Sequence, residues 1–233
     1  MPPDLRHDLM RLLAVPTLMM LAASLLLYGS HADQWLADVI YAAGGQSWAW
    51  RRAWLTNDLI HDGGRTLVGV LALGVLVAWL ASFVHPRGQR WRSPSLYLLC
   101  CALVAVALVN VLKEVTQVDC PWDLVRYGGE NLPTAFFAEA PSGQEPGRCY
   151  PAGHASAGYC WIGLYFLARQ FRPRLRLPAL LAPLGLGLVF GGAQQLRGAH
   201  FLSHDLMTLY LCWMTASLLY LTGFRARWQQ SAG

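Results

Sequence analysis

Charged residues are scarce in this sequence. Only 13% of its 233 residues are Asp, Glu, Lys or Arg, about half the fraction that is usual in soluble proteins. Lysine is nearly absent, because Lys113 is the only one among 18 basic residues. Internal repeats and low-complexity tracts are lacking too. These absences argue against a soluble multidomain protein, and we expect a single domain over residues 1–233.

Segments in which basic and aromatic residues alternate are also missing, which argues against nucleic acid as a partner. Hydrophobic residues make up 55% of the chain, and they gather in blocks that could each cross a bilayer. These blocks cover residues 12–28, 66–84, 95–112, 155–167, 177–192 and 206–221. We therefore predict an all-α fold, a bundle of six transmembrane helices. The tryptophan-rich segment 30–65 predicts short helices at the outer interface, forming either an aromatic belt or a lipid entrance.

Basic residues are divided unequally between the two ends of the predicted bundle. Eleven arginines lie on connections at one end, and seven basic residues lie in longer segments at the other. The positive-inside rule then places both termini in the cytoplasm and the segments 30–65 and 114–150 outside. Frequent arginine with little lysine indicates a GC-rich bacterial genome, so we expect a bacterial inner membrane. Ser30-His31-Ala32 resembles a signal-peptidase site, and cleavage there is the alternative for the first block.

Three polar clusters lie where predicted spans meet the outer face: residues 113–124, 149–156 and 194–205. Ionisable groups at this depth are costly and usually face a protein interior or a wet cavity. Taken singly, each has a structural explanation, such as a snorkelling lysine or a hydrogen-bonded histidine. Because all three fall at one level of the membrane, we expect a shared functional site.

The second cluster suits an anion. Pro151-Ala152-Gly153-His154 precedes a predicted helix, so free backbone N–H groups face the anion. Gly153 allows the backbone to approach it closely. In the third cluster Arg197, His200 and His204 are three and four residues apart, and they share one face if the segment is helical.

These clusters resemble the motifs of the type 2 phosphatidic acid phosphatase superfamily, the membrane-embedded lipid phosphate phosphatases. The family pattern of Lys, six residues and Arg-Pro is similar to Lys113, six residues and Cys120-Pro121. The pattern Pro-Ser-Gly-His is similar to residues 151–154. In the third pattern His200 matches the family's His, whereas Gln194 replaces an Arg and His204 replaces an Asp. The two missing arginines indicate a variant subgroup.

The resemblance implies a two-step phosphoryl transfer that needs no metal or other cofactor. His200 would attack phosphorus, and His154 would protonate the leaving lipid oxygen and then activate water. Either His204 or Asp205 would fix the tautomer of His200, and Asp205 is favoured as the source of negative charge. The phosphate would be bound by Lys113, Arg197, Ala152 and Gly153, with Arg126 and Arg148 in reserve.

The implied substrate is a membrane lipid phosphate or pyrophosphate, of the phosphatidic acid, phosphatidylglycerol phosphate, undecaprenyl pyrophosphate or lipid A type. Phosphate transfer to another lipid stays open, as does the oligomeric state. One rival is a metal-dependent membrane enzyme that uses His154, His200, His204 and Asp205 as ligands. The other is a lipid-binding or transport protein that has lost turnover.

The cysteines fall into two groups. Four lie within predicted spans, where they pack as small apolar residues: Cys100, Cys101, Cys160 and Cys212. Cys120 and Cys149 instead flank the outer segment. Because thiols tend to oxidise outside the cytoplasm, we predict a disulfide between them, with two free thiols as the alternative.

Overall fold

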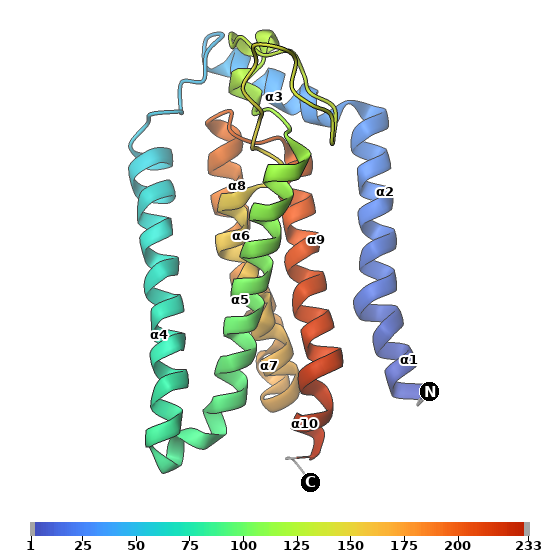
Figure 1. The fold of residues 1–233 in the computed structure, drawn as a ribbon, viewed down its shortest axis with the longest axis vertical. Coiled ribbons are helices and arrows are strands. Elements are labelled where there is room, and N and C mark those ends of the chain that lie inside the picture. The colour runs from blue at the N-terminus through green and yellow to red at the C-terminus, as the bar shows by residue number, and fades with distance from the viewer. Residues whose placement is uncertain (1–2, 231–233) are drawn as a thin grey trace.

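The computed structural model describes residues 3–230, which form an all-helical bundle (Figure 1). Within this range, five helical segments are long and apolar enough to cross a membrane. They are Leu5–Ser30, Leu55–Val84, Pro86–Asp123, Pro173–Leu196 and Leu202–Gln229. The predicted fold class is therefore confirmed as all-α, and five of the predicted spans fall on these segments.

The long helices carry these five segments. The first holds α1 (Pro3–Leu9) and α2 (Val15–Ser30), which are joined by a π-helical turn. In the second, a π-helical stretch, Leu55–Gly63, leads into α4 (Gly64–Val84). The others hold α5 (Gln89–Thr116), α8 (Arg176–Leu196), and α9 (Leu202–Leu219) followed by α10 (Arg225–Gln230).

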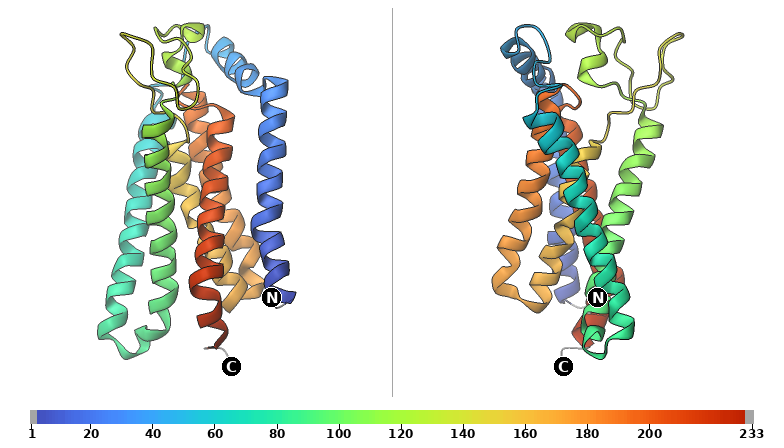
Figure 2. Two further views of the ribbon diagram at one scale, coloured as in Figure 1. Left: turned by 45° about the vertical axis from the view of Figure 1, so that its right-hand side comes forward. Right: turned by 90° about the vertical axis from the view of Figure 1, so that its left-hand side faces the viewer.

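The predicted span 155–167 falls on two shorter helices, α6 (Gly153–Tyr159) and α7 (Gly163–Phe171), joined by the 3-10 turn Cys160–Ile162. They run down the middle of the bundle and contact α5, α8 and α9 (Figures 1 and 2). Ala155, Tyr159 and Phe166 are almost completely buried. Because these helices contact protein on most sides, they need neither great length nor a fully apolar surface.

Large apolar side chains on the long helices face outward. Leu25 on α2, Leu73 on α4, Leu103 on α5 and Leu188 on α8 are between 59% and 73% exposed. A surface this apolar is rare on soluble proteins and suits the hydrocarbon core of a bilayer. The long apolar helices together with this belt indicate a membrane protein.

One end of the bundle is covered by α3 (Ala32–Ala43), by the loop that follows it and by the long loop after α5, while α1 and α10 lie at the opposite end (Figures 1 and 2). Asp38 on α3 accepts two hydrogen bonds from the Arg126 guanidinium, at 2.9 and 2.6 Å. The Trp48 ring packs against Tyr41 and Tyr127 at centroid distances of 5.3 and 5.4 Å. These contacts hold α3 against the segment that follows α5.

Candidate active site

The three polar clusters meet at the end covered by α3. Backbone hydrogen bonds link each cluster to the other two. They run from Cys149 N–H to Val118 C=O (2.9 Å), from Ala152 N–H to His204 C=O (3.2 Å) and from Trp122 N–H to Gly198 C=O (2.9 Å). Segments far apart in the sequence are thus brought into contact at one end of the bundle.

The segment before α6 is held from both sides. A disulfide bond joins Cys149 to Cys120, with the two Cα atoms 5.1 Å apart. The Thr116 hydroxyl donates to the Tyr150 carbonyl (2.6 Å), and the Thr208 hydroxyl donates to the Ala152 carbonyl (3.0 Å). Because α5 and α9 both hold this segment, the position of His154 at the start of α6 is fixed.

The turn between α8 and α9 depends on Gly198. This residue has φ of +76°, in the left-handed region that favours glycine. The Trp48 indole also lies directly against it, where a Cβ atom would clash. The tight turn brings His200 back toward the bundle axis, where it is 5% exposed.

Lys113 and His154 line a cavity of about 550 Å³ between α4, α5, α6 and α8. An ideal Cβ on Gly153 would be 3.1 Å from Lys113 Nζ, so the ammonium group lies over the glycine backbone. Within residues 3–230 this ammonium has no ion-pair or hydrogen-bond partner. An unpaired, partly buried cation of this kind suits an anionic ligand.

Two residues that the sequence analysis did not assign to the site also line this cavity, His61 and Arg65. The His61 ring stacks on His154 with centroids 3.9 Å apart, and its Nδ1 is 2.8 Å from Asp62 Oδ1. The Arg65 guanidinium has no hydrogen-bond or ion-pair partner in the described part of the chain. In the sequence, the feature that could have pointed to these two residues is their position shortly before the apolar segment 66–84.

His200 and His204 form a buried pair, with their Nδ1 atoms 3.5 Å apart. Asp205 points elsewhere: the Gln195 amide donates to its carboxylate, which lies against Gly191 on α8. The preference for Asp205 as the partner of His200 is therefore corrected in favour of His204. The physical reason is that consecutive residues of α9 face different neighbours.

Both candidate catalytic histidines are kept neutral. Burial lowers the pKa of His200 well below its usual value, and a positive charge on any of His204, Lys113 or His154 would disfavour protonation of His200 further. Burial, together with His61 and Lys113, lowers the pKa of His154 to about 4. Neutral imidazoles act as nucleophiles and bases.

The three arginines expected to bind phosphate have protein partners. Arg197 is buried and bonds to Asn57 Oδ1 (2.8 Å), the Arg51 carbonyl (3.1 Å) and Gln194 Oε1 (3.3 Å). Its positive charge still contributes to lowering the pKa of His154. Arg148 pairs with Glu114, and Arg126 pairs with Asp38. The structure therefore assigns Arg126 and Arg148 to exposed ion pairs, a correction to their expected role.

Among residues 3–230, no three His, Cys, Asp or Glu side chains are grouped so as to hold a metal ion.

The family model of the PAP2 superfamily matches residues 94–228. This range includes all three polar clusters, and it excludes the segment that supplies His61 and Arg65. No match was found among curated proteins or among solved structures.

Proposed function

The chain belongs to the PAP2 superfamily, and from this premise we propose that it is a membrane phosphatase acting on a lipid phosphate or pyrophosphate. Membership of this family indicates phosphatase activity. The observation that carries the proposal is the unpaired ammonium of Lys113, which lies over Gly153 beside His154. A phosphate group would neutralise this cation within reach of the candidate catalytic histidines.

The lining of the cavity favours a lipid over a soluble phosphate ester. Lys113, Arg65 and His154 supply the polar part. His61, Asn110 and Ser156 add further polar groups, and the rest of the wall is mainly apolar, with Val68, Val106, Ala157 and Phe190 from α4, α5, α6 and α8. An amphiphile with an anionic head and a hydrocarbon chain matches both parts, because the head would contact the basic side chains and the hydrocarbon chain would contact the apolar wall.

In the first step, His200 attacks phosphorus through Nε2. Its Nδ1 faces His204, so Nδ1–H would donate to that ring and leave the Nε2 lone pair free. The new P–N bond forms as the P–O bond to the lipid breaks. His154 gives its proton to the departing oxygen, since a bound phosphate dianion raises its pKa above the value in the empty site.

In the second step, His154 takes a proton from water, and the resulting hydroxide attacks phosphorus. The P–N bond breaks, which regenerates neutral His200 and releases inorganic phosphate.

The positive charge of the missing family arginines must come from other residues. Cys120 stands at the position of one of these arginines, but it is in a disulfide and carries no charge. We assign the compensating positive charge to Arg65 and Arg197, together with Lys113.

For the arrangement in the membrane, we propose six crossings, with the α6–α7 pair as the fourth. The candidate site then faces outward, and both termini lie in the cytoplasm of a bacterium. The division of charge supports this orientation, because eleven arginines but only two acidic residues, Asp4 and Asp8, belong to the end that carries α1 and α10.

The test is phosphate release from dioctanoyl phosphatidic acid by the purified protein. We expect H200A to lower the rate by about 1,000-fold or more, whereas H85A, at an exposed position, leaves it unchanged. Labelled substrate should also leave an acid-labile phosphoenzyme in the wild type and none in H200A. Equal phosphate release by wild type and H200A would refute the proposal. Lipid binding without any release would favour the lipid-binding alternative.

A further inference from the structure

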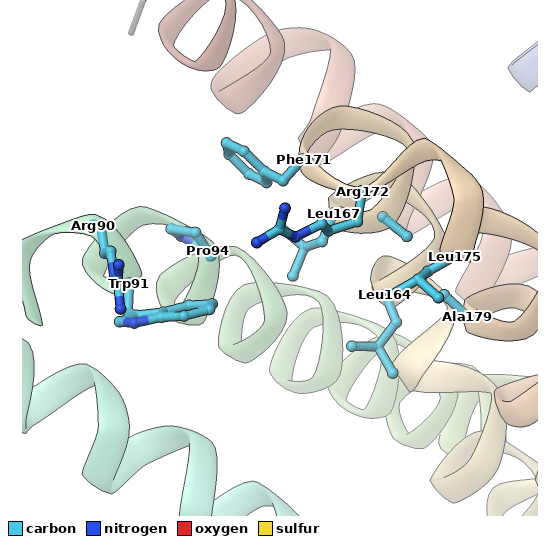
Figure 3. A pocket seen from close by; sticks show the side chains of 10 residues that line it. Arg90, Trp91, Pro94, Leu164, Leu167, Phe171, Arg172, Leu175 and Ala179 are labelled. Carbon is cyan, nitrogen blue, oxygen red and sulfur yellow. The ribbon is translucent and has the colours of Figure 1, made fainter. Parts of the chain in front are cut away.

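A second cavity, of about 590 Å³, lies at the opposite end of the bundle. Its walls come from the start of α5 and from the segment that runs from α7 into α8 (Figure 3). They are mostly apolar, formed by Trp91, Pro94, Leu164, Leu167, Phe171 and Leu175. Trp91 and Leu175 are 56% and 55% exposed, so the cavity opens on the lipid-facing surface.

Two arginines belong to this otherwise apolar cavity. The Arg90 guanidinium lies over the Trp91 ring, 5.4 Å from its centroid. The Arg172 guanidinium extends from the end of α7 toward α5, into the space between them (Figure 3). In the described part of the chain neither guanidinium has a hydrogen bond or an ion pair with a carboxylate.

Acidic residues that could neutralise these arginines are scarce at this end. The connections here carry eleven arginines and only two acidic residues, Asp4 and Asp8. Asp8 is already paired with Arg169 at 2.5 Å and with Arg225 at 3.4 Å. Positive charge therefore remains in excess around an apolar cavity at membrane level, which is the arrangement that attracts anionic lipid head groups.

We propose that this cavity binds an anionic phospholipid from the leaflet at the arginine-rich end. The lipid phosphate lies between Arg90 and Arg172, and an acyl chain follows the apolar wall of α5 and α7. Trp91 sits at the level of the head groups, which indole rings prefer. Arg90 and Lys113 both lie on α5, roughly 35 Å apart at 1.5 Å per residue, so this lipid is separate from the substrate.

The experiment is native mass spectrometry of the full-length protein in detergent, with phosphatidylglycerol and phosphatidylcholine of equal chain length. We expect wild type to retain phosphatidylglycerol in preference to phosphatidylcholine. The double variant R90A/R172A should bind phosphatidylglycerol roughly 10- to 30-fold more weakly. The control R87A/R174A removes two arginines at the same end that do not line the cavity, and it should keep the preference.

Several outcomes would overturn the proposal. One is equal retention of both lipids by wild type, and another is an equal loss of binding in both double variants, which would indicate diffuse attraction. A third is competition by soluble glycerol 3-phosphate as strong as that by the lipid, which would point to a small anion. Size-exclusion profiles of both variants check that each is folded, and R90K/R172K should restore most of the binding.

Discussion

At the residue scale, the contact between His200 and His204 bears on which nitrogen of the proposed nucleophile would react. The two Nδ1 atoms face each other at 3.5 Å, so the proposed mechanism assigns the attack on phosphate to Nε2 of His200. The family has an aspartate at the position of His204. A neutral imidazole there still accepts the Nδ1–H bond, but it adds no negative charge. The pair would therefore orient the proposed nucleophile, with less electrostatic support for the imidazolium than a carboxylate would give.

We predict that H204A lowers kcat by roughly 100-fold or more, because the tautomer and orientation of His200 are no longer fixed. H204D should retain much of the activity, since a carboxylate accepts the same hydrogen bond. D205N is the matched control on the neighbouring residue, and it should leave kcat close to wild type because Asp205 faces Gln195. Steady-state kinetics with dioctanoyl phosphatidic acid checks this. A larger loss in D205N than in H204A would restore Asp205 as the supporting residue.

Arg65 is predicted to carry part of the phosphate affinity. Its guanidinium lines the same cavity as Lys113 and has no partner among the described residues. Loss of a charge-assisted hydrogen bond should lower kcat/KM of R65A by roughly 10- to 100-fold, and R65K should recover part of it. R52A removes an exposed arginine from the same segment and serves as the control. Equal kinetics for R65A and R52A would exclude Arg65 from the site.

Spacing along the chain was enough to propose Lys113, His154 and His200 as candidates, because each lies in a local motif whose order can be read from one sequence. The family match confirms that resemblance. Arg65 and His61 could not be found in this way. Their membership of the site depends on how one helix packs against another, and one sequence contains no signal for that packing. The same limit explains the choice between His204 and Asp205, which depends on the rotation of α9.

At the scale of elements, the helical segment that ends in α4 explains why these residues were missed. The apolar block predicts a span that begins at residue 66, but the helical stretch begins at Leu55. Its first turns carry Asn57, Asp58, His61 and Asp62, which conceal the helix from a hydropathy argument. Polar residues at the end of a spanning helix are thus part of the candidate site.

The disulfide between Cys120 and Cys149 is predicted to stabilise the site as well as the fold. It ties the end of the α5 segment to the residues before α6. Replacing both by serine should cost about 3 kcal/mol in the chain-entropy model, or roughly 6–12 °C in unfolding midpoint. Phosphatase activity should fall with it, because the segment leading to His154 loosens. Thermal unfolding in detergent measures the effect, with C100S as the control. An unchanged midpoint would contradict this prediction.

At the scale of the whole molecule, the bundle separates its charges. Acidic residues gather at the end that holds the candidate site, and unpaired arginines gather at the other. The helices between them expose leucine and valine to the surroundings. This charge separation supports the proposed orientation, because reversing it would move many arginines to the outer side. In the proposed orientation, the cavity that holds Lys113 and the cavity between Arg90 and Arg172 would serve different leaflets.

This arrangement depends on whether the α6–α7 pair crosses the membrane, and cysteine labelling on either side of the pair tests it. Ser142 lies before the pair and Arg174 lies after it, so S142C and R174C should be labelled from opposite sides of the membrane. A membrane-impermeant maleimide should reach S142C in intact cells, and it should reach R174C only after permeabilisation. Q89C, at the first residue of α5, should behave like R174C, because both positions lie at the arginine-rich end. If S142C and R174C react together in intact cells, the pair does not cross. One terminus would then lie outside, and the proposed orientation would fail.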